Sequence, residues 1–160
     1  MQTHPAPPLQ WHDGLLLGYG PMDRVHETFV AVVSHLQTCP ESDVAAALNA
    51  VQTHLQEHFG AEDQWMQATD FPARDCHIEE HAAVLSSVHQ VQERLAQRGD
   101  VALCRRLADE LARWFPGHAD YLDSALAHWM CQQRLGGKPV VIRRQTITSP
   151  DPVPRPLTPP

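Results

Sequence analysis

Residues 44–55 carry an apolar stripe at helical spacing that continues, one turn further on, into polar residues. The stripe consists of Val44, Leu48, Val51 and Leu55, spaced four, three and four apart as on the buried face of an amphipathic helix. The next two positions on the same face are His58 and Glu62. Because an unpartnered polar group is costly to bury, this pattern predicts a helix that carries specific chemistry into a protein core.

Turn signals divide the middle of the chain into four helical segments, each with a stripe of this kind. The segments lie between Gly20 and Pro40, between Ser42 and Thr69, between Pro72 and Gly99, and between Asp100 and Gly136. Connections this short between long helices imply antiparallel neighbours. We therefore expect an all-α fold, an up-down-up-down antiparallel four-helix bundle.

Histidine interrupts the stripe of every predicted helix. The interrupting residues are His26 in the first, His58 with Glu62 in the second, His77 and His81 in the third, and His118 in the fourth. At about 1.5 Å per residue, all six fall in the same half of an antiparallel bundle. A single histidine on an apolar face is usually a satisfied core residue, but burying this many titratable groups costs several kcal/mol each without compensation. A metal site removes that cost, because neutral imidazoles and ionised carboxylates become its ligands.

The two ends of the chain differ from the bundle in composition. Residues 136–160 hold 7 of the 14 prolines and no amphipathic stripe, which predicts a disordered Pro-rich tail. Residues 1–20 form a second Pro-rich stretch, expected to be an N-terminal arm held by Trp11. The bundle domain is thus predicted to span residues 21–135.

Several classes of function are disfavoured by composition. The net charge of −7 argues against a nucleic-acid partner, and no run approaches the ~20 apolar residues of a membrane span. The N-terminus lacks the basic and apolar regions of a signal peptide, so the expected location is the cytoplasm. The four cysteines form no CxxC pair, which excludes the usual thiolate zinc and haem-attachment motifs.

Two kinds of metal protein use a four-helix bundle of this size. Ferritin-like di-iron proteins carry Glu-x-x-His pairs, but no glutamate in this chain has a histidine three residues later. The alternative rests on four ordered motifs: "MDRVH" (22–26), "HFGAE" (58–62), "FPARDCHIEEH" (71–81) and "WFPGHADYLD" (114–123). With these motifs, roughly residues 11–134 resemble the hemerythrin family, specifically single-domain bacterial hemerythrins.

The resemblance implies a non-haem di-iron site with an oxo or hydroxo bridge and reversible binding of O₂. It implies that His77, His81 and His118 hold one iron and that His26 and His58 hold the other. Glu62 and Asp123 would bridge the two ions. The assignment of Asp123 rests on the resemblance alone, because five residues after His118 it lies about 140° around a straight helix.

The surroundings of the implied site show both matches and departures. Trp114 matches a pocket position of the family, and the other expected lining residues are Phe59, Leu85 and Leu122. The departures are Val25 in place of a frequent glutamine, Ala119 in place of a bulkier aliphatic residue, and Pro116-Gly117 directly before His118. A proline inside a helix bends its axis, so we expect a bent fourth helix and a roomier pocket.

Three functions are compatible with such a site. The first is reversible O₂ carriage, storage or delivery, in which the chain is not an enzyme and O₂ is its partner. The second is O₂ or redox sensing through a redox or effector protein that binds non-covalently. The third is enzymatic reduction of peroxide or NO. The sequence favours the first and leaves the oligomeric state open.

Overall fold

The computed structural model describes residues 6–143, and in that part of the chain every regular element is helical. The long helices are α1 (Gly20–Thr38), α2 (Val44–Ala68), α3 (Arg74–Arg98), α4 (Val101–His118) and α5 (Ser124–Leu135). A π-helical turn, η3 (Ala119–Asp123), joins α4 to α5, and the one-turn 3₁₀ helices η1 (Asp13–Leu15) and η2 (Glu41–Asp43) precede α1 and α2. The predicted all-α class is confirmed. Residues 1–5 of the expected arm and 144–160 of the expected tail lie outside the described residues.

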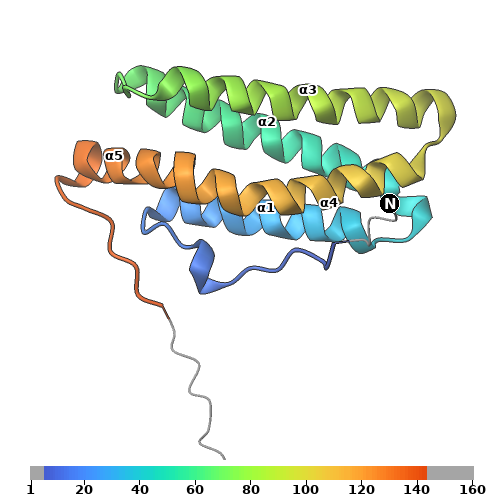
Figure 1. Cartoon of the computed structure of the whole chain (residues 1–160), viewed down its shortest axis with the longest axis horizontal. Coiled ribbons are helices and arrows are strands. Elements are labelled where there is room, and N and C mark those ends of the chain that lie inside the picture. The colour runs from blue at the N-terminus through green and yellow to red at the C-terminus, as the bar shows by residue number, and fades with distance from the viewer. Residues whose placement is uncertain (1–5, 144–160) are drawn as a thin grey trace, which may run out of the picture.

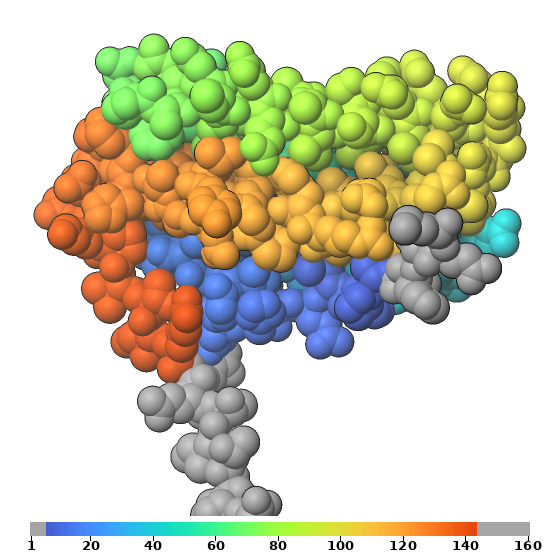
Figure 2. Space-filling view, viewed as in Figure 1, coloured from blue at the N-terminus to red at the C-terminus, as the bar shows by residue number. Residues whose placement is uncertain are grey.

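The helices form a closed antiparallel ring, with α4, η3 and α5 acting together as the fourth member (Figure 1). In it α1 packs on α2, α2 on α3, α3 on α4, and α4 back on α1. The space-filling view shows α3 lying along α4 and α5 on one face of the molecule (Figure 2). The predicted up-down-up-down bundle is therefore confirmed. No helix among residues 6–143 is both long enough and apolar enough to cross a membrane.

The apolar stripes predicted for the first two helices are buried along their whole length in α1 and α2. In α4 the buried face runs through Phe115, which is fully buried, whereas its neighbour Trp114 is only partly buried. Both residues still pack against the main core. The apolar residues thus enclose the stretch of the bundle where the predicted site residues lie.

The N-terminal arm is fastened to α1 by hydrogen bonds. The carboxylate of Asp23 accepts the backbone N–H groups of Leu17 (2.7 Å) and Gly18 (3.0 Å), and Leu9 N–H donates to the side chain of Gln37 (2.8 Å). Trp11 packs against the main core, as expected. Asp23, the acidic residue of the first motif, therefore fixes the start of α1, the helix that carries His26.

The fourth helix departs from the expected simple bend. Pro116 lies inside α4, and the π-helical turn follows within three residues, with Ser124 N–H donating to the carbonyl of Ala119 in an i→i+5 bond. A π turn of this kind accommodates one extra residue in an otherwise α-helical run. Ala119 is 1% exposed and belongs to the main core, so this side of the helix is packed.

Candidate metal centre

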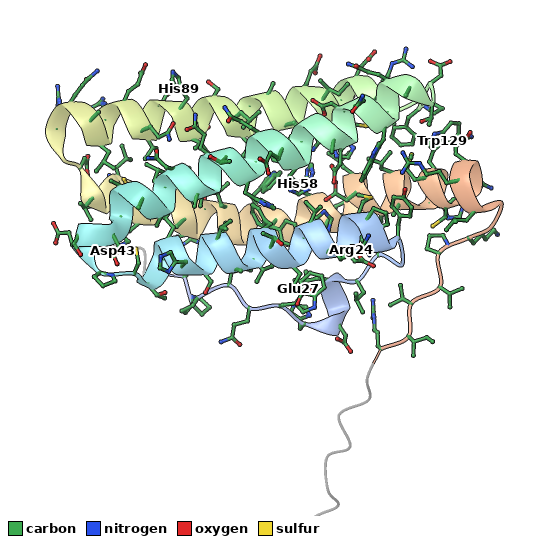
Figure 3. All side chains as sticks on the ribbon, turned by 180° about the vertical axis from the view of Figure 1, so that it is seen from behind. Arg24, Glu27, Asp43, His58, His89 and Trp129 are labelled. Carbon is green, nitrogen blue, oxygen red and sulfur yellow. The ribbon has the colours of Figure 1, made fainter. Side chains whose placement is uncertain are left out.

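The structure brings together all seven residues predicted to hold the metal. Each is at most 3% exposed, and they come from α1, α2, α3, α4 and the π turn η3: His26, His58, Glu62, His77, His81, His118 and Asp123. His58 lies between the helices in Figure 3, whereas His89 on α3 lies on the outer surface and is 65% exposed. The possible ligand atoms form two groups that share Glu62, and within each group these atoms lie within 4.8 Å of one another. Besides Glu62, the three-histidine group contains His77, His81, His118 and Asp123, and the two-histidine group contains His26 and His58.

The carboxylate of Asp123 divides its two oxygens between these groups. Its Oδ1 lies 3.0 Å from Nε2 of both His77 and His118. Its Oδ2 lies 3.1 Å from Nε2 of His26. The π-helical turn explains how Asp123 reaches this position, since i→i+5 geometry brings residues five apart onto one face. The side chain therefore does not need to reach sideways from a straight helix.

Glu62 divides its oxygens in the same way from the opposite helix. Its Oε1 is 2.9 Å from Nε2 of His58 and 3.7 Å from Nε2 of His26. Its Oε2 is 3.4 Å from Nε2 of His81 and 3.6 Å from Nε2 of His77. Each carboxylate thus has one oxygen beside the three-histidine group and the other beside the two-histidine group.

Close approach in this centre does not satisfy the hydrogen-bonding capacity of its atoms. Within the described part of the chain, the buried atoms without a hydrogen-bond partner include Nε2 of His26, Nε2 of His81, Oε2 of Glu62 and both carboxylate oxygens of Asp123. His26 Nε2 is only 3.1 Å from Asp123 Oδ2, yet the geometry is not that of a hydrogen bond. Donor atoms that converge without bonding to one another fit a shared cation, because it removes the penalty of burying them unpaired.

The carboxylates and histidines of the centre shift one another's pKa values. Burial alone would lower the pKa of His26, but the nearby carboxylates of Asp123 and Glu62 outweigh it and raise the pKa from 6.5 to about 9. The pKa of Asp123 is held well below its usual range, because its histidine neighbours outweigh the effect of burial. Without a metal the centre therefore keeps a proton on His26, and a metal ion must displace that proton to bind there.

Two acidic residues next to the predicted ligands belong to the centre and were not predicted from the sequence. Asp63 Oδ1 lies 2.7 Å from Nδ1 of His81, and Glu80 Oε1 lies 2.9 Å from Nδ1 of His118. Asp63 directly follows Glu62 in "HFGAED", and Glu80 directly precedes His81 in "HIEEH". That adjacency is the only signal in the sequence, and on a helix it is also typical of a solvated acidic face.

Aromatic rings surround the histidines of the centre. Phe59 stacks on His81 with ring centroids 4.0 Å apart, Trp114 lies 4.3 Å from His118, and Phe115 lies 5.2 Å from His26. Of the four expected lining residues, Phe59 and Trp114 contact the centre in this way. Leu85 is partly buried against the main core, and Leu122 is partly exposed.

A cavity of about 510 Å³ lies between α1 and α2, next to the centre. It reaches His58 and Glu62, and its walls include Val25, His54 and Trp65. His54 is partly buried, which lowers its pKa to about 4, so this imidazole is neutral at neutral pH. The cavity therefore lies beside the two-histidine group rather than the three-histidine group.

Comparison with known proteins gives the centre a family. Residues 17–129 match the Hemerythrin HHE cation binding domain. The chain is 39% identical over 127 residues to the bacteriohemerythrin of Ralstonia nicotianae (strain ATCC BAA-1114 / GMI1000), an alignment that covers 79% of this chain and 92% of the relative. It is 26% identical over 111 residues to the bacteriohemerythrin of Aquifex aeolicus (strain VF5), covering 66% of this chain and 85% of the relative.

No solved structure gave a significant match. The family match covers most of the chain, including the six predicted ligands that lie on four helices and Asp123 at the π turn. It also agrees with the resemblance drawn from the four sequence motifs. The chain belongs to the hemerythrin family.

Proposed function

We propose that the chain holds two non-haem iron ions in this centre and binds O₂ reversibly, for carriage, storage or delivery. The proposal rests on the position of two carboxylates. Glu62 and Asp123 each present one oxygen to the three-histidine group and the other oxygen to the two-histidine group. Two carboxylates placed in this way suit a pair of neighbouring cations. Imidazole and carboxylate donors suit iron in ligand type.

Each residue then has a defined role. His77, His81 and His118 would hold one ion, His26 and His58 would hold the other, and Glu62 and Asp123 would each offer an oxygen to both. When bound, the ferrous ions supply the electrons for reversible binding of O₂. The second ion would be held by one histidine fewer than the first, so it would be the one better able to take a small ligand.

The surroundings support a binding function at that ion. The cavity between α1 and α2 reaches the two-histidine group through His58 and Glu62, which leaves room for a small molecule beside this group. Phe59, Trp114 and Phe115 cover the remaining sides of the histidines with apolar surface. Apolar walls limit the water that can enter the centre, and so would slow irreversible oxidation of the iron.

The experiment is iron analysis followed by an oxygenation cycle. Protein loaded with Fe²⁺ under anaerobic conditions is expected to contain about two iron ions per chain. Its absorption spectrum should change on exposure to O₂ and return when O₂ is removed. Full loading that is followed by an irreversible change, or by turnover of added peroxide or NO, would favour the enzymatic alternative. Reversal that requires a second protein would favour the sensing alternative.

A further inference from the structure

The five histidines differ in whether a carboxylate lies beside Nδ1, the ring nitrogen that faces away from the centre. Nδ1 of His81 lies 2.7 Å from the carboxylate of Asp63, and Nδ1 of His118 lies 2.9 Å from that of Glu80. Within residues 6–143, Nδ1 of His26, His58 and His77 has no hydrogen-bond partner. Carboxylate support therefore reaches two members of the three-histidine group and neither member of the two-histidine group.

A carboxylate at Nδ1 prepares a histidine to bind a metal through Nε2. It holds the proton on Nδ1, which leaves the lone pair of Nε2 free and makes that nitrogen more basic. A neutral histidine without such a partner can carry its proton on either nitrogen. His58, whose Nε2 lies 2.9 Å from Glu62 Oε1, must therefore adopt the correct tautomer when the ion binds, whereas a carboxylate already holds Nδ1 of His81 and of His118.

The rings of the supported histidines are also fixed by aromatic contacts. One oxygen of Glu80, Oε1, accepts both Nδ1–H of His118 and the indole N–H of Trp114 (2.8 Å). The Trp114 ring in turn packs on His118. His81 is held in the same manner, between Asp63 and the stacked ring of Phe59, whose plane is within 6° of its own.

We infer that Asp63 and Glu80 are positioning residues that make the three-histidine subsite the tighter of the two and the first to fill. This inference rests on the proposed two-metal function and adds an order of loading to it. Removing partners of this kind lowers metal affinity by about 10–100-fold in metalloproteins. The effect is expected on the first binding step and not on the second.

The test is a titration of the metal-free full chain with Co²⁺ against a competing chelator. The variants are Asp63→Asn, Glu80→Gln and Glu80→Leu. Glutamine keeps an oxygen that can accept both hydrogen bonds but removes the charge, whereas leucine removes both. The expected order of affinity for the first step is wild type, then Glu80→Gln, then Glu80→Leu, with a loss of about 10–100-fold for the last. Asp63→Asn should also weaken the first step.

Two further variants assign the steps and control for the substitutions. His58→Ala should remove the weaker step and leave the tighter one. Glu79→Gln and Glu79→Leu change the exposed carboxylate next to Glu80 and should leave both steps unchanged. The melting temperature of each metal-free variant separates loss of affinity from loss of fold, and indole fluorescence reports whether Trp114 has lost its partner.

The outcomes separate this inference from the proposed function. A wild type that binds two Co²⁺ ions, with first-step affinity unchanged in Glu80→Leu and Asp63→Asn, overturns the inference alone. So does a His58→Ala variant that loses the tighter step. A wild type that binds one ion or none overturns the proposed two-metal function as well. Selective weakening of the first step in folded Glu80→Leu and Asp63→Asn supports both.

Discussion

Asp123 Oδ1 lies 3.0 Å from Nε2 of His118, although the two residues are five positions apart on one continuous helical run. A straight α-helix would place them about 140° apart. The π-helical turn Ala119–Asp123 removes that difference by closing an i→i+5 hydrogen bond. The backbone of the fourth helix, more than the reach of the side chain, therefore places this carboxylate in the centre.

This relationship predicts that one residue can be deleted from the turn without loss of the centre. Tyr121 is 82% exposed, and its deletion would shorten the spacing between His118 and the aspartate from five residues to four. Residues four apart share a face in an ordinary α-helix. We expect the deletion variant to retain its metal content and to melt close to the wild type.

The matched control is deletion of Glu110, an exposed residue in the regular part of α4. An α-helix cannot absorb that loss, so everything after it rotates by about 100° relative to the preceding turns. The control should therefore lose both metal and stability. A folded Tyr121 deletion that binds no metal would show that the π turn itself is required.

The ligand histidines could be predicted because they replace apolar residues on stripes whose burial is regular. His26 and His58 follow this rule, and both are buried as expected. The π turn could not be predicted by the same rule, because a periodic reading assumes about 3.6 residues per turn throughout. Pro116 signalled only that the helix is disturbed. Asp63 and Glu80 could not be distinguished from solvent-facing carboxylates, since their partners are known only after the helices pack.

Removal of the metal should lower the stability of the bundle. The metal-free centre leaves Asp123 and Glu62 buried with unpartnered oxygens among five histidines. An ion bound at 1,000 times its Kd stabilises the folded state by about 4 kcal/mol, if the unfolded chain does not bind it. We expect a clear fall in melting temperature after chelation and recovery when iron is restored. Equal melting temperatures with and without metal would contradict the proposed site.

Ala119→Ile should destabilise the protein, because Ala119 is buried in the main core. Adding carbon atoms to a packed site costs about 1–3 kcal/mol. Denaturant unfolding of the metal-free proteins measures this change, with Tyr121→Ile as the exposed control in the same turn. Unchanged stability would instead support the roomier pocket expected from the sequence, and slower oxidation of the oxygenated protein would then be expected as well.

Truncation after Gly137 should leave the bundle and its centre intact. In the described part of the removed segment, Val140 is 77% exposed and Ile142 is 85% exposed. Little apolar burial is lost with them. Melting temperature and metal content should therefore match those of the full chain. Loss of metal on truncation would show that the segment contributes to the centre.

The metal-free protein should lose stability as the pH rises through about 9. The pKa of His26 is raised from 6.5 to about 9 in the folded state by the carboxylates of Asp123 and Glu62, against the effect of burial. A raised folded-state pKa contributes stability that is fully present below pH 6.5 and declines as the pH approaches and passes 9. The pKa of His118 is also raised, with the same sign. The expected result is a melting temperature lower at pH 9.5 than at pH 6.5.

The metal-loaded protein provides the control for this pH dependence. When His26 serves as a ligand it carries no proton at Nε2, so its contribution to stability no longer varies between pH 6.5 and 9.5. Conversely, the affinity of the metal-free protein for the ion that His26 binds should rise with pH over this range. At higher pH His26 is protonated in a smaller fraction of the molecules, so the ion has to displace a proton less often. Chelator competition at several pH values measures that affinity. If the metal-free and metal-loaded proteins showed the same decline in melting temperature, the decline could not be assigned to the histidines of the centre.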